Sequence, residues 1–130
     1  MKKKFVFAVA IAACTFFSCK KSDPTPTVVP AEGNWVGKYG AGGGPEVNYY
    51  AFQFDAGGAV SIKANDILSP NMATGIWSIS NDSIRSTYTY APGGTFSMIG
   101  KYDGHSNTIT GTWGSGNSNK DGGTFTITKQ

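Results

Sequence analysis

From Gly33 to the C-terminus, apolar and polar residues alternate in short runs, and no stretch carries apolar residues at the spacing of a helix. In residues 83–90, for example, Ile84 and Tyr88 alternate with Arg85 and threonines. Alternation with a period of two places successive side chains on opposite faces of a strand. This pattern predicts an all-β domain whose sheet has one dry face and one solvated face.

Turn-forming residues divide the region into eight predicted strands. Clusters of Gly, Asn, Asp and Pro, such as residues 55–58 and 91–94, stand between the alternating runs. Because most of the connections are short, each strand should pair with its successor in an antiparallel meander. We expect strands at residues 34–39, 47–54, 59–64, 74–80, 83–90, 95–102, 108–113 and 124–129.

A sheet with one dry face and no helix to cover it can bury that face by curling shut, which also removes both exposed edges. We therefore predict an eight-stranded antiparallel up-and-down (meander) β-barrel over residues 33–130. The alternative is a two-sheet β-sandwich, although no connection clearly provides the long crossover of a Greek key. The side chains expected on the dry face are Trp35, Tyr39, Phe52, Phe54, Val60, Ile62, Trp77, Ile79, Ile84, Tyr88, Phe96, Met98, Ile109, Trp113, Phe125 and Ile127.

The N-terminus has the pattern of a signal peptide over residues 1–18. Three lysines precede an apolar run of thirteen residues, 5–17, which is too short to span a bilayer. Ser18 and Cys19, followed at once by polar chain, resemble a bacterial lipobox, in which the cysteine becomes the lipidated first residue. This predicts a mature chain that begins at Cys19 and carries acyl chains such as palmitate.

Two alternatives for the N-terminus stay open. The box ending at Cys14 fits the strict lipobox pattern better, but it would leave Thr15 and two phenylalanines directly after the lipid. An ordinary secretory signal with free thiols is the other alternative. With lipidation at Cys19, residues 19–32 form a Pro- and Thr-rich tether. We then expect the protein to be held by its lipid in the cell envelope, at the outer membrane, on its periplasmic or surface face.

Charge and cysteine content exclude several classes of partner. The three lysines at positions 2–4 account for the formal charge of +3, because the remaining eight basic residues balance the eight acidic ones. No basic stripe is left for a nucleic acid. Residues 33–130 contain no cysteine, so we expect neither a disulfide framework nor a cysteine-based metal site there.

The tripeptide Gly-x-Trp occurs three times, at Trp35, Trp77 and Trp113. The first resembles the Gly-x-Trp on the opening strand of lipocalins, where the tryptophan closes one end of the barrel. From Gly33 to Lys129 the pattern is similar to small lipocalin-like (calycin-type) domains of unknown function in bacterial lipoproteins. The resemblance implies a barrel but leaves the function open, because calycins include ligand carriers, biotin binders and inhibitors.

Residues for catalysis or metal binding are sparse. His105 is the only histidine and lies in a predicted turn, 103–107, where we expect it to be solvated. The acidic residues are scattered through turns, where side chains of this type bond to their own backbone. We therefore expect no enzymatic activity, no cofactor and no metal.

Loop lengths predict which end of the barrel is open. In a meander, the connections at 40–46, 65–73, 91–94 and 114–123 share one end, and they include the three longest. The segment 65–73 is apolar through Ile67, Leu68 and Met72; it is either a lid over a ligand or a cluster that caps the core, and we favour the second.

The predicted function rests on the aromatic interior. A narrow barrel with so many rings is more easily filled than hollow, but space at the long-loop end could hold a small apolar or aromatic ligand. The alternative is a filled scaffold whose loops dock another envelope protein. The candidate ligand-binding residues are Trp35, Tyr50, Phe52, Trp77, Tyr88, Phe96 and Trp113.

Overall fold

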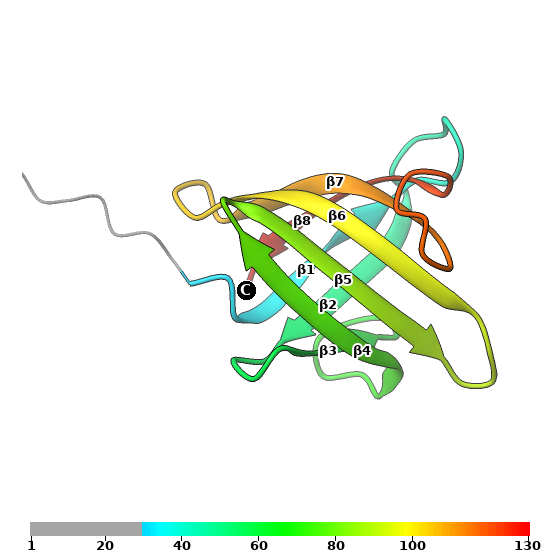
Figure 1. The fold of residues 1–130 in the computed structure, drawn as a ribbon, viewed down its shortest axis with the longest axis horizontal. Helices are drawn as coiled ribbons and strands as arrows, with labels where there is room; N and C mark the ends of the chain where they lie inside the picture. The colour runs from blue at the N-terminus through cyan, green and yellow to red at the C-terminus, as the bar shows by residue number, and fades with distance from the viewer. Residues whose placement is uncertain (1–29) are drawn as a thin grey trace, which may run out of the picture.

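A computed structural model describes residues 30–130. The predicted signal peptide, both cysteines and most of the predicted tether lie outside the described residues. Within the described range the chain forms one closed antiparallel barrel of eight strands (Figure 1). No helix among these residues has the length and apolar character needed to cross a membrane.

The strands follow the alternating runs of the sequence closely. Their bounds are β1 Gly33–Tyr39, β2 Asn48–Phe54, β3 Ala59–Lys63, β4 Asn71–Ser80, β5 Ser83–Tyr90, β6 Thr95–Asp103, β7 Thr108–Ser115 and β8 Gly123–Lys129. Every strand pairs with its successor, and β1 pairs with β8 from Trp35↔Lys129 to Tyr39↔Phe125. The predicted meander barrel is therefore confirmed, and the chain does not adopt the sandwich.

In three strands glycine stands where neighbouring backbones approach closely: Gly37 in β1, Gly75 in β4 and Gly111 in β7. A Cβ at Gly75 would lie 1.9 Å from the carbonyl oxygen of Thr87, and one at Gly111 would lie 2.0 Å from that of Ile99. Only a residue without a side chain fits at such a distance. Gly75 and Gly111 each precede a tryptophan by two residues, so two of the three Gly-x-Trp tripeptides place a close backbone approach beside a large inward ring.

The core fills the lumen of the barrel except at the long-loop end. Its largest fully buried side chains are Trp35, Phe52, Phe54, Phe125, Ile62, Ile84, Met98, Ile109, Ile127 and Val60. Every side chain predicted for the dry face belongs to this core or packs partly buried against it, with the exception of Ile79. Ile79 is 40% exposed because the pairing of β3 with β4 ends at Ala59↔Ile76, which leaves the last residues of β4 without a neighbour on that side.

A β-bulge extends β4 towards the long-loop end of the barrel. The predicted strand began at Thr74, whereas β4 begins at Asn71. Ile62 pairs with Ala73 but Lys63 pairs with Asn71, so Met72 is the extra residue of the bulge. The sequence prediction missed these residues because a bulge interrupts the alternation of polar and apolar positions.

The long loops share one end of the barrel, as predicted. The loop after β1 bonds to the start of β8 through Gly40 N and Thr124 O at 2.9 Å, and the loop after β7 bonds to β6 through Gly116 N and Thr95 O at 2.8 Å. The described N-terminal segment and the tight turns lie at the opposite end (Figure 1). We call the long-loop end the mouth and the opposite end the closed end.

Candidate ligand-binding site at the mouth of the barrel

The mouth holds a pocket with a volume of about 370 Å³. All but one of its lining residues are aromatic, and four of these are tyrosines. The lining consists of Tyr39, Tyr50, Met72, Tyr88, Tyr90, Phe96 and Trp113. The volume falls within the range of small-molecule sites in proteins, which are concave, mostly apolar and marked by a few polar groups.

Strand ends bring these rings together from across the chain. Tyr39 ends β1 and Tyr90 ends β5, while Trp113 lies near the end of β7. The Tyr39 ring meets that of Trp113 edge to face, with centroids 5.4 Å apart and planes at 85°. Tyr90 and Phe96 form a similar pair at 5.6 Å and 88°. These perpendicular contacts hold the walls of the pocket in fixed orientations.

The floor of the pocket is a pair of buried tyrosines. The hydroxyl groups of Tyr50 and Tyr88 bond to one another, and both side chains are almost fully buried. Phe52 lies beneath them, with its ring centroid 4.4 Å from that of Tyr50 and 5.8 Å from that of Tyr88. The pocket is therefore shallow relative to the barrel, because the core begins directly below this floor.

Burial dominates the electrostatics of the floor. It raises the pKa of Tyr50 well above the usual value for a phenol, and the neighbouring hydroxyls of Tyr88, Tyr90 and Tyr39 raise it further. Burial likewise raises the pKa of Tyr88, although its bond with Tyr50 works against the rise. No residue of the lining carries a formal charge at neutral pH. The site thus offers ring surfaces and neutral hydroxyl groups.

The one indole N–H in the lining is already occupied. Trp113 Nε1 donates to the carbonyl oxygen of Gly40 at 2.9 Å, which fastens β7 to the loop after β1. Trp113 therefore contributes its ring surface to the pocket and its N–H to the frame of the mouth.

The structure divides the predicted ligand-binding residues between the two ends of the barrel. Four of them line the mouth pocket: Tyr50, Tyr88, Phe96 and Trp113. Phe52 lies under the floor. Trp35 and Trp77 lie towards the closed end and donate their indole N–H groups to Ala31 O and Asp55 O, both at 2.8 Å. Contact with a ligand stays a prediction for the four, and the other three are separated from the pocket.

Three lining residues were missing from the predicted site. The positions of Tyr39 and Tyr90 contained a usable signal, because each ends a strand just before a connection on the long-loop side. Met72 gave no such signal, since its place in the lining depends on the bulge. The favoured interpretation of segment 65–73, a cluster capping the core, is wrong for two of its apolar residues, because Leu68 is 92% exposed and Met72 is 49% exposed.

Packed side chains cover the closed end in the part of the chain that the structure describes. Trp35 is fully buried, its ring meets that of Tyr102 edge to face at 6.1 Å, and Lys129 Nζ lies 5.7 Å above its centroid. The Lys129 ammonium also donates to the carbonyl oxygens of Pro30 and Glu32, which draws the N-terminal segment across this end. Trp35 thus takes the place that the lipocalin resemblance implied for it.

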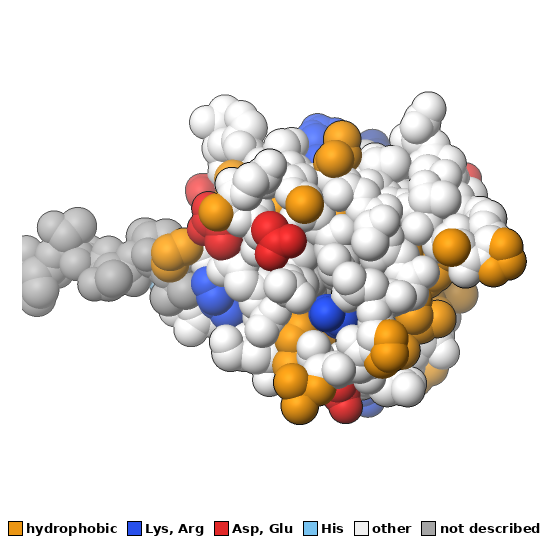
Figure 2. Space-filling view, turned by 90° about the horizontal axis from the view of Figure 1, so that it is seen from below, with side chains coloured by type: hydrophobic (Ala, Val, Ile, Leu, Met, Phe, Trp, Pro, Cys, Tyr) orange, Lys and Arg blue, Asp and Glu red, His pale blue; other side chains and the backbone are white. Residues whose placement is uncertain are grey.

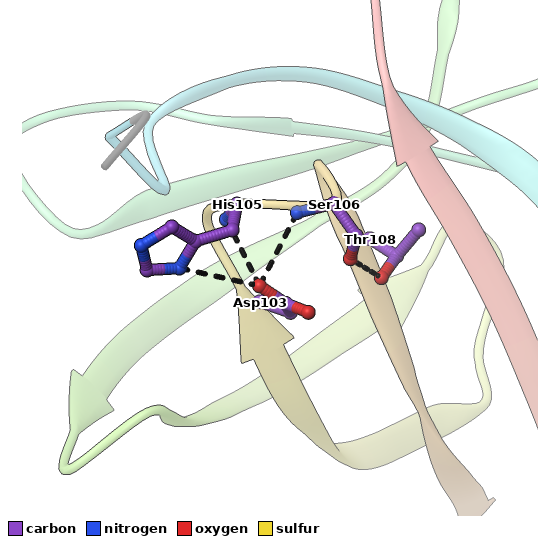
Figure 3. Close-up of polar contacts among 4 residues, drawn as sticks. All are labelled: Asp103, His105, Ser106 and Thr108. Atoms are coloured by element: carbon purple, nitrogen blue, oxygen red, sulfur yellow. Dashed lines mark hydrogen bonds and ion pairs between the residues drawn. The ribbon is translucent and has the colours of Figure 1, made fainter. Parts of the chain in front are cut away.

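His105 lies in a solvated turn at the closed end, as predicted (Figure 3). Its backbone N–H and that of Ser106 donate to Asp103 Oδ1 at 2.9 and 3.2 Å, and its imidazole Nδ1 lies 3.7 Å from the same oxygen. These bonds, led by that of the His105 backbone, lower the pKa of Asp103. The three residues build a turn, and within residues 30–130 no three His, Cys, Asp or Glu side chains gather as a metal site would need.

The outer wall has a second hollow of about 370 Å³ over β6 and β7. Its lining includes Lys101 and Thr110, which are exposed, and the paired Gly100 and Gly111. The hollow lacks the ring surfaces of the mouth.

Figure 2 shows hydrophobic side chains gathered towards the end of the barrel away from the N-terminal segment, on a surface that is otherwise mostly uncharged.

Comparison of the chain with protein-family models, with curated proteins and with solved structures gives no match. The functional interpretation therefore rests on the geometry of the pocket and on the sequence.

Proposed function

We propose that this protein is a lipid-anchored module of the cell envelope that binds a small, largely apolar or aromatic molecule in the mouth pocket and catalyses no reaction. The observation that supports this most is the volume of about 370 Å³ within a lining of six aromatic rings and one methionine. Apolar surface that stays open at the end of an otherwise filled barrel is stabilised when a ligand removes it from water.

The lipid anchor in this proposal rests on the sequence of residues 1–19. If Cys19 is the acylated residue, Cys19→Ala abolishes metabolic labelling with an alkyne analogue of palmitate, whereas Cys14→Ala leaves it intact. Loss of label only in Cys14→Ala would move the anchor to Cys14. An absence of label in the unaltered protein would contradict the anchor altogether.

The ligand can be sought by native mass spectrometry of the full-length protein purified from its own envelope. We expect an adduct of a small molecule that is lost in Met72→Trp, because the larger side chain would fill the pocket. Ile76→Trp is the matched control, since Ile76 lies on the same strand and is 71% exposed but is not in the lining. An adduct that survives Met72→Trp would place the ligand elsewhere.

A docking scaffold is the second candidate, because two apolar side chains in mouth loops are largely exposed. Val47 is 64% exposed and Leu68 is 92% exposed. If the barrel is only a scaffold, no small-molecule adduct appears, and Leu68→Ser together with Val47→Ser reduces capture of a partner protein.

A further inference from the structure

The hydroxyl pair on the pocket floor has one hydrogen more than it uses. Two phenol groups carry two hydroxyl hydrogens, and a single bond between Tyr50 and Tyr88 takes up only one of them. Neither hydroxyl makes another hydrogen bond to the described residues. One donor is therefore left over at a position where both side chains are almost fully buried.

The residues around this donor limit the directions from which an acceptor can approach it. Below the pair lies Phe52, and Phe125 meets the Tyr50 ring edge to face at 5.5 Å, so neither neighbour offers an acceptor. On the other side lies the pocket, which both tyrosines line. Because the left-over donor has no partner among the described residues and both tyrosines line the pocket, an acceptor supplied from the pocket can bond to it.

Resting on the proposed function, we propose that the ligand is an uncharged ring compound with a hydrogen-bond-accepting oxygen, such as a ketone or an ether, that reaches the Tyr50–Tyr88 pair while its ring lies among the aromatic walls. Phe96 and Trp113 supply apolar ring surface for the body of the ligand, and the Tyr50–Tyr88 pair donates a hydrogen bond to the oxygen of the ligand.

The same features disfavour a charged ligand. The lining has no cationic side chain to balance an anion, and moving a carboxylate out of water without such a partner is costly. The raised pKa values of Tyr50 and Tyr88 show the same penalty acting on negative charge at the floor. A cation is attracted by ring faces, but it offers no acceptor to the left-over hydrogen.

Four probes of nearly equal size and shape separate these properties. 2-Acetylnaphthalene carries a carbonyl oxygen, 2-isopropenylnaphthalene replaces that oxygen with a methylene group, 2-naphthoate carries an anion, and 2-naphthyltrimethylammonium carries a cation. Equilibrium dialysis with the full-length protein in nanodiscs measures each affinity, with empty nanodiscs as the blank. The binding that is lost in the Met72→Trp variant is taken as binding in the mouth pocket.

We expect 2-acetylnaphthalene to bind about tenfold more tightly than 2-isopropenylnaphthalene, the difference that one hydrogen bond typically makes. The double variant Tyr50→Phe/Tyr88→Phe should bring the two affinities together. Tyr102→Phe is the matched control: it removes a hydroxyl at the closed end that is buried without a partner among the described residues, and the tenfold difference should persist.

The outcomes that overturn the inference differ from those that overturn the proposed function. If the acetyl and isopropenyl probes bind equally well in the unaltered protein, or if either charged probe binds most tightly, the neutral acceptor is wrong while a mouth pocket remains. If no probe shows binding that Met72→Trp abolishes, the proposed function itself fails. The comparison in the unaltered protein decides the inference even if the double variant does not fold.

Discussion

The two ends of the barrel both carry a Gly-x-Trp motif, but they differ in how deeply its tryptophan is buried. At the closed end, Trp35 donates its indole N–H to Ala31 O, and at the mouth, Trp113 donates to Gly40 O. Trp35 is fully buried, because the N-terminal segment and Lys129 cover it, whereas Trp113 is only partly buried and borders a pocket. A Gly-x-Trp therefore secures a barrel end by one indole bond, and the chain around it decides whether that end is sealed.

The difference between the ends is also one of polar groups. At the closed end, the Tyr102 hydroxyl is buried without a partner among residues 30–130. The mouth concentrates four phenol groups, two of which bond to each other. Under the proposed function, the closed end mainly stabilises the barrel and the mouth binds the ligand, and the predictions below test that division.

Removing the Trp35 side chain at the closed end should have the largest effect on stability. Trp35→Ala empties a fully buried site and should lower the free energy of unfolding by about 4 kcal/mol. Trp113→Ala should cost about 2 kcal/mol, because part of its surface is already in water. Urea denaturation of the two variants measures both. Equal losses would contradict the division between the ends.

A methyl group in the wall should be nearly as damaging. Gly111→Ala places a Cβ 2.0 Å from a backbone oxygen, so the strands must separate, and we expect a loss of about 3 kcal/mol. Gly43→Ala in the loop after β1 is the control, because a Cβ there meets nothing within 4 Å. It should leave the midpoint of denaturation unchanged or slightly raised. A comparable loss in both variants would show that the close approach in the wall is unimportant.

Alkaline pH should weaken the mouth. The pKa values of Tyr50 and Tyr88 are raised in the folded state, so their neutral forms favour folding: the stabilisation is complete below the usual phenol pKa of 10.0 and is lost as the pH rises above it. Each group should contribute a slope of about 1.4 kcal/mol per pH unit in that range. Urea denaturation between pH 8 and 11.5 should show a shallower fall in Tyr50→Phe/Tyr88→Phe. An unchanged slope in this variant would exclude the pair as its source.

Single hydroxyl deletions should separate the two ends more finely. Tyr88→Phe leaves the Tyr50 hydroxyl without its protein partner and should cost about 1 kcal/mol of stability. Tyr102→Phe removes a buried hydroxyl that has no partner among the described residues, so stability should stay the same or rise by about 1 kcal/mol. Thermal denaturation of both variants measures the contrast, which reverses if the Tyr102 hydroxyl has the more important bond.

The turn at the closed end should have the smallest effect. The pKa of Asp103 is lowered in the folded state, so its ionised form favours folding: the contribution is complete above its usual pKa of 3.8 and is lost as the pH falls through the lowered value. Asp103→Asn should slightly flatten the fall in melting temperature below pH 4. Affinity at the mouth should not change in this variant, and a change would mean that the two ends are coupled.

Strand order and most of the core could be predicted because alternation and turn chemistry are local properties of the sequence. The eight strands lie within three residues of their predicted bounds, and the largest difference, at the start of β4, comes from the bulge at Met72. The exposure of Ile79 could not be predicted from its own position in the alternation. It depends on where the pairing of β3 with β4 ends, and the sequence of β4 alone does not determine that point.

The candidate site was predictable in part for the same reason. Inward aromatic residues could be recognised from alternation, but their height in the barrel depends on the stagger between strands, which the sequence does not state. Phe52 and Tyr50 point inward from the same strand, yet one lies under the floor and the other forms it. The alternation alone also offers Trp35 and Trp77 as ligand-binding residues, whereas both lie towards the closed end.

The N-terminal segment leaves the barrel across the closed end, where Lys129 holds the carbonyl oxygens of Pro30 and Glu32. Residue 30, the first that the structure describes, therefore lies on the side opposite the mouth. A support joined directly to residue 30 would face the closed end and leave the pocket open to the bulk solution.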